Sequence, residues 1–211
     1  MGKFKLVCFD LDDTLIYEID SVMIPCIING KENEQSAIRE KEKAGQFDYV
    51  TADHMSASLF KGLQESKIKD SFLQVAKPID NIGYVVDKLH ENGMLCIVIT
   101  VGPKQVAKAV SEIWGFDGHY GSDYEVIDGV FTGNLAKFVE APDKIKCLMD
   151  FCGKNNIASG ECIAVGDGVT DIPIFEYCAK AIAINAAPDV KLKATHAVDT
   201  QDLTDILKYI L

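Results

Sequence analysis

Residues 5–15, Lys-Leu-Val-Cys-Phe-Asp-Leu-Asp-Asp-Thr-Leu, begin as a short apolar run and continue into three carboxylates, Asp10, Asp12 and Asp13. A continuous apolar run of this length is typical of a parallel strand that is buried on both faces. In open α/β sheets, ligands bind at the carboxyl ends of such strands, which is where these carboxylates lie. The stretch therefore predicts an acidic ligand site; the alternative is a solvated acidic turn after a strand.

Further apolar runs follow along the chain, and helical patterns lie between them. The runs are Met94–Ile99, Cys162–Val165 and Ala181–Ile184, and the helical patterns are Ile79–His90, Gln105–Trp114 and Asp143–Phe151. This alternation predicts an α/β fold with a doubly wound parallel sheet. The Asp128-Gly129 pair lies between two short β-prone runs and predicts a tight hairpin over residues 124–135, at the edge of the core.

The stretch from Ile19 to Ala76 is too long for an ordinary loop between a strand and a helix. Met55 and Leu59 recur there at helical spacing, so we predict a small helical cap over residues 17–76, inserted after the first strand. A Rossmann-like core then comprises residues 1–16 and 77–211. The charged run from Lys31 to Lys43 mixes both signs, which predicts a solvated helix face, with a docking surface as the alternative.

Composition limits the classes of partner. The chain has 211 residues, of which 48% are hydrophobic, and its formal net charge is −11, which repels nucleic-acid backbones and anionic membranes. Arg39 is the only arginine, and no apolar run approaches the length of a membrane span. The seven cysteines contain no CxxC pair and no signal-peptide pattern precedes the first strand. We therefore expect a cytoplasmic protein with no nucleic-acid or membrane partner.

A second acidic stretch, Gly-Asp-Gly-Val-Thr-Asp at residues 166–171, follows another apolar run. If the two strand ends are neighbours, the carboxylates of both stretches converge: Asp10, Asp12, Asp167 and Asp171. Such a cluster demands a hard divalent cation, and Mg²⁺ suits a site that also binds phosphate oxygens. Neither stretch has the twelve-residue loop ending in glutamate that an EF-hand calcium site needs.

Two further positions could complete a phosphate site. Thr100 ends the second apolar run, and Val101 follows it before a helix start, where a hydroxyl and backbone N–H groups can bind an anion. Lys144 lies at another helix start, where its ammonium could neutralise phosphate charge. We predict Thr100, Val101 and Lys144 as phosphate-binding residues; the alternatives are an ordinary strand-end turn and a surface lysine.

Through Phe-Asp-Leu-Asp-Asp-Thr-Leu-Ile at 9–16, Thr100, Lys144 and the stretch 166–171, in this order, the sequence resembles the haloacid dehalogenase-like hydrolase superfamily. Within it, the chain is similar to the phosphoserine phosphatase branch over nearly its whole length. The resemblance implies that Asp10 attacks phosphorus to give an aspartyl phosphate. It also implies that Asp12 protonates the leaving oxygen and then activates water.

The same resemblance implies the binding roles. Mg²⁺ would be held by Asp10, the backbone carbonyl of Asp12, and Asp167. Asp171 would support the metal through a water molecule or through contacts to the residues that bind it. Thr100 and Lys144 would bind the transferring phosphoryl group.

The sequence departs from the phosphoserine pattern where the substrate's amino acid part would bind. Glu18 resembles the glutamate that receives the substrate amine, but it stands one residue closer to the nucleophile. The position of the family's cap arginine falls near His54, and Arg39 is far upstream. Glu18 and His54 are the candidate substrate residues, with a surface carboxylate and a helix-face histidine as the alternatives. The sequence also differs from the phosphoserine phosphatase branch at two motif positions. Val101 stands where that branch usually has glycine, and Thr170 stands where it usually has asparagine.

The expected function is a Mg²⁺-dependent phosphatase for a small phosphomonoester, with a cap that closes over the substrate. Phosphoserine, a sugar phosphate or another small phosphomonoester could be the substrate, and transfer to an acceptor alcohol is an alternative to hydrolysis. A phospho-accepting receiver domain is a remoter alternative, because no apolar strand ends in aspartate between residues 20 and 90. A silent scaffold is weaker still, since both carboxylates of the first motif remain. The oligomeric state is left open.

Overall fold

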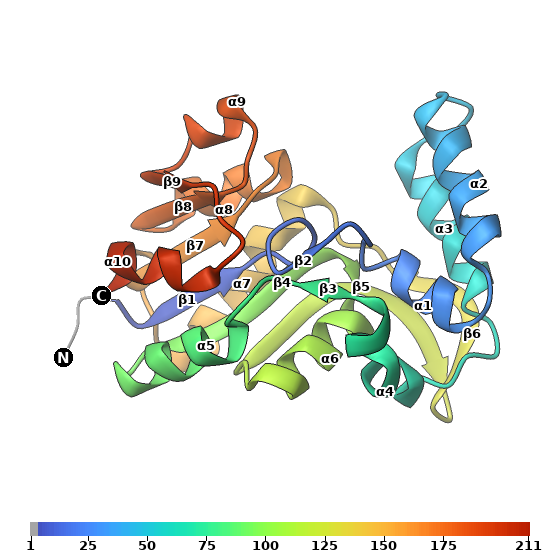
Figure 1. Cartoon of the computed structure of the whole chain (residues 1–211), viewed down its shortest axis with the longest axis horizontal. Coiled ribbons are helices and arrows are strands. Elements are labelled where there is room, and N and C mark those ends of the chain that lie inside the picture. The colour runs from blue at the N-terminus through green and yellow to red at the C-terminus, as the bar shows by residue number, and fades with distance from the viewer. Residues whose placement is uncertain (1–3) are drawn as a thin grey trace.

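The computed structural model describes residues 4–211, and residues 1–3 of the predicted core range lie outside the described residues. A seven-stranded sheet forms its centre in the order β6-β5-β4-β1-β7-β8-β9 (Figure 1). All neighbouring strands are parallel except β5 and β6. The strands are β1 (Leu6–Phe9), β4 (Leu95–Pro103), β5 (Gly118–Ile127), β6 (Val130–Lys137), β7 (Cys162–Gly166), β8 (Lys180–Ile184) and β9 (His196–Val198). The α/β class and the parallel sheet are confirmed.

Helices cover both faces of this sheet. The helices are α1 (Met23–Ile28), α2 (Glu32–Lys43), α3 (Tyr49–Leu59), α4 (Ser66–Val75), α5 (Ile82–Glu91), α6 (Lys104–Trp114), α7 (Ala141–Asn155), α8 (Ile172–Tyr177), α9 (Pro188–Lys191) and α10 (Leu207–Ile210). Val7 and Phe9 of β1 face one hydrophobic cluster with α5 and α6, whereas Leu6 and Cys8 face another with α7 and α8. Alternate residues of one strand thus enter two cores, as expected for a doubly wound sheet.

Strand β1 occupies the position that matters for function. It pairs with β4 on one side and with β7 on the other. After β1 the chain forms β4, β5 and β6 on one side of it, and only then β7, β8 and β9 on the other side. The strand order therefore reverses between β1 and β7, which is the topological switch point of the sheet. Ligands of open α/β sheets bind in the crevice at this point, beyond the carboxyl ends of the strands. Asp10 directly follows β1, and Asp167 directly follows β7.

The stretch 17–76 contains the helices α1 to α4, and a two-stranded pair, β2 (Ile16–Tyr17) with β3 (Lys77–Pro78), joins its two ends. Figure 1 shows α2 and α3 standing side by side at one end of the molecule. The charged run forms α2, with one buried side that contains Gln35 and Ile38 and with the remaining residues largely at the surface. The division into a core and a cap stays a prediction.

The β5–β6 hairpin lies at the sheet edge, as predicted, and holds the helical stretch in place. Asp128 and Gly129 both have positive φ, 51° and 77°, which a two-residue turn of this kind requires. The backbone N–H of Gly62 donates to the carbonyl of Phe131 on β6 (2.9 Å). The ring of Phe60, which is fully buried, stacks on Tyr124 of β5 at 4.8 Å and meets the Phe131 edge at 5.5 Å.

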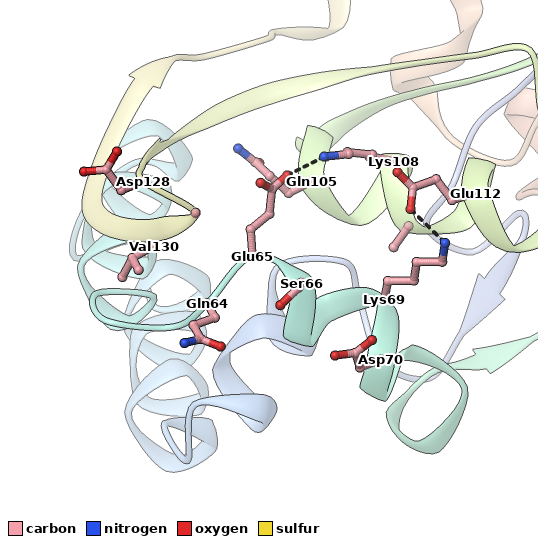
Figure 2. Close-up of a pocket in the computed structure, with 12 residues that line it drawn as sticks. Gln64, Glu65, Ser66, Lys69, Asp70, Gln105, Lys108, Glu112, Asp128 and Val130 are labelled. Carbon is pink, nitrogen blue, oxygen red and sulfur yellow. Dashed lines mark hydrogen bonds and ion pairs between the residues drawn. The ribbon is translucent and has the colours of Figure 1, made fainter.

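A polar cavity of about 470 Å³ lies between α4, α6 and the hairpin turn (Figure 2). Two ion pairs cross it from α4 and its preceding loop to α6, Lys69–Glu112 (3.0 Å) and Lys108–Glu65 (3.0 Å). None of the carboxylates at the ends of β1 and β7 lines this cavity. Its ion pairs join α4 and the residue before it to α6. Within residues 4–211, no helix has both the length and the apolar character of a membrane span.

Because Phe60 joins the helical stretch to the hairpin, Phe60→Ala should lower the free energy of unfolding by about 3–5 kcal/mol, the cost of an emptied aromatic site. Urea denaturation of both proteins measures this difference. Tyr49→Ala, which truncates an exposed aromatic residue on α3, is the matched control and should cost less than about 1 kcal/mol. Equal losses for the two variants would show that Phe60 is not the anchor.

Candidate active site

Asp10 is the buried carboxylate at the end of β1. Its backbone N–H donates to the carbonyl of Val165 (2.9 Å), which continues the β1–β7 pairing and fixes the backbone beneath the side chain. Its Oδ1 accepts a hydrogen bond from Lys144 Nζ at 2.5 Å. Burial and the charge of Asp171 raise the pKa of Asp10 well above its ordinary value, although Lys144 acts in the opposite direction. Asp10 is thus a carboxylate whose ionised form depends on nearby positive charge.

Lys144 supplies that charge from the first turn of α7, where Pro142 helps to start the helix. Its side chain is fully buried, and its Nζ also donates to Asp171 Oδ1 at 2.7 Å. Burial alone would lower the pKa of Lys144, but Asp10 and Asp171 outweigh burial and raise it. An unpaired buried ammonium would be costly, so the lysine and its two carboxylates require one another.

Asp171 organises the loop after β7. Its Oδ2 accepts the backbone N–H groups of Asp167 (3.2 Å) and Gly168 (3.1 Å), while Oδ1 binds Lys144. The loop passes so close to this carboxylate that a Cβ on Gly166 would lie 2.4 Å from Asp171 Cγ. Only glycine fits at residue 166 without displacing Asp171.

Asp167 completes a group of three carboxylates. Carboxylate oxygens of Asp10, Asp167 and Asp171 all lie within 4.8 Å of one another. Thr14 Oγ1 donates to Asp167 Oδ1 (3.1 Å) and so orients it toward the group. Burial, followed by the charge of Asp171, raises the pKa of Asp167 to about 7.

These residues fit a hard divalent cation. The group supplies oxygen donors only, and three carboxylates share one lysine. The strand-end carboxylates that the sequence predicted to converge do so, apart from the side chain of Asp12.

The Asp12 side chain has a separate environment. Its Oδ1 accepts the backbone N–H of Ser21 (2.5 Å), and its Oδ2 accepts the Ser21 hydroxyl (2.7 Å) and the Thr100 hydroxyl (3.3 Å). Burial, followed by the charge of Asp20, raises the pKa of Asp12 to about 6. A carboxyl group with that pKa can both give and take a proton near neutral pH.

The predicted phosphate residues Thr100 and Val101 lie beside Asp12, but β4 continues through them to Pro103 rather than ending at Thr100. Thr100 Oγ1 accepts the backbone N–H of Gly102 (2.9 Å), and the Val101 carbonyl accepts the Ser122 hydroxyl (2.6 Å). A Cβ on Gly102 would lie 2.1 Å from Ser21 Oγ. The glycine therefore permits the contact between Ser21 and Asp12.

Both predicted substrate residues lie at the surface. Glu18 is exposed and forms an ion pair with Lys77, and His54 is exposed on α3.

Other charged residues of the helical stretch lie nearer to Asp12. Arg39 Nε is 3.9 Å from Asp20, the neighbour of Ser21, and Arg39 Nη1 is 3.7 Å from Asp53 and 2.9 Å from Glu42. Arg39 lies far upstream of His54 in the sequence, but the packing of α2 against α3 brings its guanidinium beside Asp53, the neighbour of His54. Ser21 had no sequence signal, since its role follows only from the fold of the loop after β2.

Comparison with known proteins agrees with this geometry. A profile described as haloacid dehalogenase-like hydrolase matches residues 7–176. The chain is 30% identical to a phosphoserine phosphatase of Halobacterium salinarum, over 93% of each chain. It is 28% identical to a phosphoserine phosphatase of Methanocaldococcus jannaschii, over 99% of this chain and 98% of the relative. Solved structures of a substrate-bound phosphoserine phosphatase and of a phospho-aspartyl intermediate analogue match with TM-scores of 0.79 and 0.78. Each is 26% identical to this chain, and each match covers 99% of this chain and 99% of the solved structure.

Gly166→Ala should destabilise the protein by about 1–3 kcal/mol, because the new methyl group overlaps Asp171. Gly153→Ala is the matched control: Gly153 lies within α7, and a Cβ there meets nothing within 4 Å. That control should stabilise the helix by up to about 1 kcal/mol. Urea unfolding of the two variants should therefore give opposite signs, and two stabilised proteins would contradict the close packing at Gly166.

Mg²⁺ should raise the melting temperature more at pH 8 than at pH 5. A cation binds the ionised form of Asp167, whose pKa is about 7, and below that pH it must displace a proton. Without the ion, this carboxyl group should make the protein less stable as pH rises from about 4 through 7, because the folded form holds the proton more tightly than the unfolded form.

Differential scanning fluorimetry with and without Mg²⁺ measures this response. Asp167→Asn should remove it, whereas Asp189→Asn, which alters an exposed carboxylate on α9, should keep it. An unchanged response in Asp167→Asn would place the ion elsewhere.

Proposed function

The chain belongs to the haloacid dehalogenase-like hydrolase family, and on that basis we propose that it is a magnesium-dependent phosphatase, similar to phosphoserine phosphatases, for a small phosphomonoester. The observation that carries the proposal is the separation of two carboxylates. Asp10 lies with Lys144 and the loop carboxylates, whereas Asp12, two residues later, has neutral hydrogen-bond donors. One environment suits a nucleophile, and the other suits an acid and base.

Asp10 is the proposed nucleophile. Its carboxylate attacks the phosphorus atom, an Asp10–phosphate bond forms, and the bond from phosphorus to the leaving oxygen breaks. Lys144, at 2.5 Å, favours the ionised form of Asp10 and offsets repulsion between that carboxylate and an incoming phosphate. We assign Thr100 and Val101, beside Asp12, to the phosphoryl oxygens together with Lys144.

Asp12 is the proposed acid and base. In the first step its protonated form gives a proton to the leaving oxygen, and in the second its ionised form takes one from the water that attacks the phosphorus of the aspartyl phosphate. The hydroxyl groups of Ser21 and Thr100 hold the Asp12 carboxyl group in one orientation. Its pKa of about 6 allows both forms near neutral pH.

Asp10, Asp167 and the backbone carbonyl of Asp12 would hold Mg²⁺, with Asp171 supporting them by fixing the loop. When bound, the ion would neutralise charge on the phosphoryl oxygens. The donor set supports this assignment, since it contains oxygen atoms alone.

The substrate side of the proposal rests on residues 17–76 acting as a cap over a core of residues 1–16 and 77–211. Phosphoserine is the favoured substrate because relatives named phosphoserine phosphatase match 93% and 99% of this chain. Another small phosphomonoester and phosphotransfer to an alcohol are the alternatives, and Glu18 and His54 stay predictions for substrate binding. The seven free cysteines, five of them buried, favour a reducing compartment, so we place the protein in the cytoplasm.

Asp10→Asn should reduce Mg²⁺-dependent hydrolysis of p-nitrophenyl phosphate by at least about 10⁴-fold, because the amide cannot act as the nucleophile. Asp13→Asn is the matched control. Asp13 lies in the same motif, is exposed, and has a φ of 56°, which asparagine adopts readily. This control should keep activity within a few-fold, and activity that persists in purified Asp10→Asn would refute the nucleophile.

A phosphate-release panel at fixed Mg²⁺ separates the alternatives. Fastest release from phosphoserine supports the favoured substrate, and faster release from a sugar phosphate selects another phosphomonoester. If an added alcohol becomes phosphorylated and less inorganic phosphate is released, the protein is a phosphotransferase. A long-lived aspartyl phosphate without turnover, formed from a small acyl phosphate, would instead support a signalling domain.

A further inference from the structure

Four of the seven cysteines lie in a row beneath the candidate active site. Cys152 Sγ lies 3.5 Å from Cys162 Sγ, and Cys178 packs against the hydrophobic cluster that contains Cys8, Cys152 and Cys162. We refer to Cys8, Cys152, Cys162 and Cys178 as the thiol row. All seven cysteines are free thiols in this structure.

Each member of the thiol row belongs to an element that also positions a site residue. Cys8 lies in β1, two residues before Asp10. Cys152 lies in α7, the helix that carries Lys144, and Cys162 begins β7, the strand that leads to Asp167. Cys178 directly follows α8, the helix that begins after Asp171. A chemical change in the row therefore acts on the elements that hold the carboxylates and the lysine.

The row is not arranged as a metal site. A thiolate-bound soft metal needs several sulfur atoms around one point. Within residues 4–211, two groups of three or more metal-ligating side chains have all their donor atoms within 4.8 Å of one another. Neither group contains any of these four cysteines. The close approach of Cys152 and Cys162 favours chemistry between pairs of sulfur atoms instead.

Cys162 and Cys178 are the pair best placed for such chemistry. The backbone N–H of Ala179 donates to the carbonyl of Cys162 (3.1 Å), so the two cysteine backbones are neighbours, as a disulfide requires. Cys178 is partly exposed, whereas Cys162 and Cys152 are buried. The hydrogen bond from Cys178 lowers the pKa of Cys162, which favours the thiolate form that attacks sulfur.

We propose that the thiol row is a peroxide-sensitive modification site that forms a disulfide centred on Cys162, first with Cys178, and that this disulfide lowers the activity of the proposed active site. The second part rests on the proposed function, whereas the first does not.

The chemistry balances with hydrogen peroxide as the oxidant. The Cys178 thiol attacks one peroxide oxygen, the O–O bond breaks, and a sulfenic acid and water are formed. The hydrogen bond to Cys162 raises the pKa of Cys178, so this first step is the slow one. Cys162 then attacks the sulfenic sulfur and expels the second water molecule. Two thiols are oxidised, and one peroxide is reduced to two waters.

Cys152 extends the site by exchange. Its sulfur can attack Cys162 within the first disulfide, which would form a Cys152–Cys162 bond and release Cys178 as a thiol. A disulfide bond is about 2.05 Å long, so the 3.5 Å separation must close by roughly 1.5 Å. Closure would draw α7, which carries Lys144, toward β7, and a displacement of about 1 Å can cost up to 10²-fold in rate.

The test treats the reduced, Mg²⁺-loaded full chain with hydrogen peroxide and maps cross-linked peptides by mass spectrometry without reduction. We expect Cys162–Cys178 or Cys152–Cys162 as the main cross-link. We also expect about a tenfold loss of phosphatase activity that dithiothreitol restores. Cross-links mainly through other cysteines, or oxidation to sulfinic acid without a disulfide, would overturn the site. The expected disulfide with unchanged activity would overturn its regulatory effect.

Matched variants separate this site from general oxidation. Cys178→Ala should slow inactivation by peroxide by at least about fivefold, because it removes the more exposed partner of the buried Cys162. Cys147 is partly buried like Cys178, but it lies in α7 and outside the thiol row. Peroxide should inactivate Cys147→Ala at the same rate as the unmodified protein. Equal inactivation rates for the two variants would contradict the proposal. A reduced protein without phosphatase activity would count against the proposed function alone, since peptide mapping needs no turnover.

Discussion

The buried ammonium of Lys144, held between Asp10 and Asp171, is the interaction on which the candidate site depends. Three segments far apart in the sequence supply these groups: the end of β1, the first turn of α7 and the loop after β7. None of the charges is stable alone in a buried site, and each is stabilised by the others. The lysine offsets only part of the negative charge, because Asp167 is a third carboxylate in the same group. The remaining negative charge is what a divalent cation would compensate.

The fold gives two neighbouring carboxylates different chemistry. Asp10 continues the β1–β7 pairing and so faces the lysine, whereas the chain turns after it and directs Asp12 toward Ser21 and Thr100. Two close approaches by glycine make this arrangement possible, Gly102 against Ser21 and Gly166 against Asp171. The assigned roles of nucleophile and of acid and base thus follow from what each carboxylate contacts, although their sequence positions are nearly the same.

Local sequence signals predicted the strands that carry the site, because short apolar runs and strand-end carboxylates are visible within a few residues. The Asp128-Gly129 turn was equally clear, since its positive φ values restrict the residue types. The signals failed for contacts between distant segments. Ser21 binds Asp12 only because a loop returns to β4, and Arg39 approaches Asp20 only because α2 packs on α3. Glu18, which stands one residue from the family's position, pairs with Lys77 at the surface and stays a prediction for substrate binding.

The central claim is that Asp10 and Asp167 share one divalent cation at the ends of β1 and β7. A crystal structure of the chain grown with Mn²⁺ in place of Mg²⁺ tests it most directly, through the anomalous signal of the metal. The account predicts one strong peak between the carboxylates of Asp10 and Asp167, close to the carbonyl of Asp12. A fully occupied peak elsewhere, with Lys144 alone between Asp10 and Asp171 and no metal beside them, would contradict it.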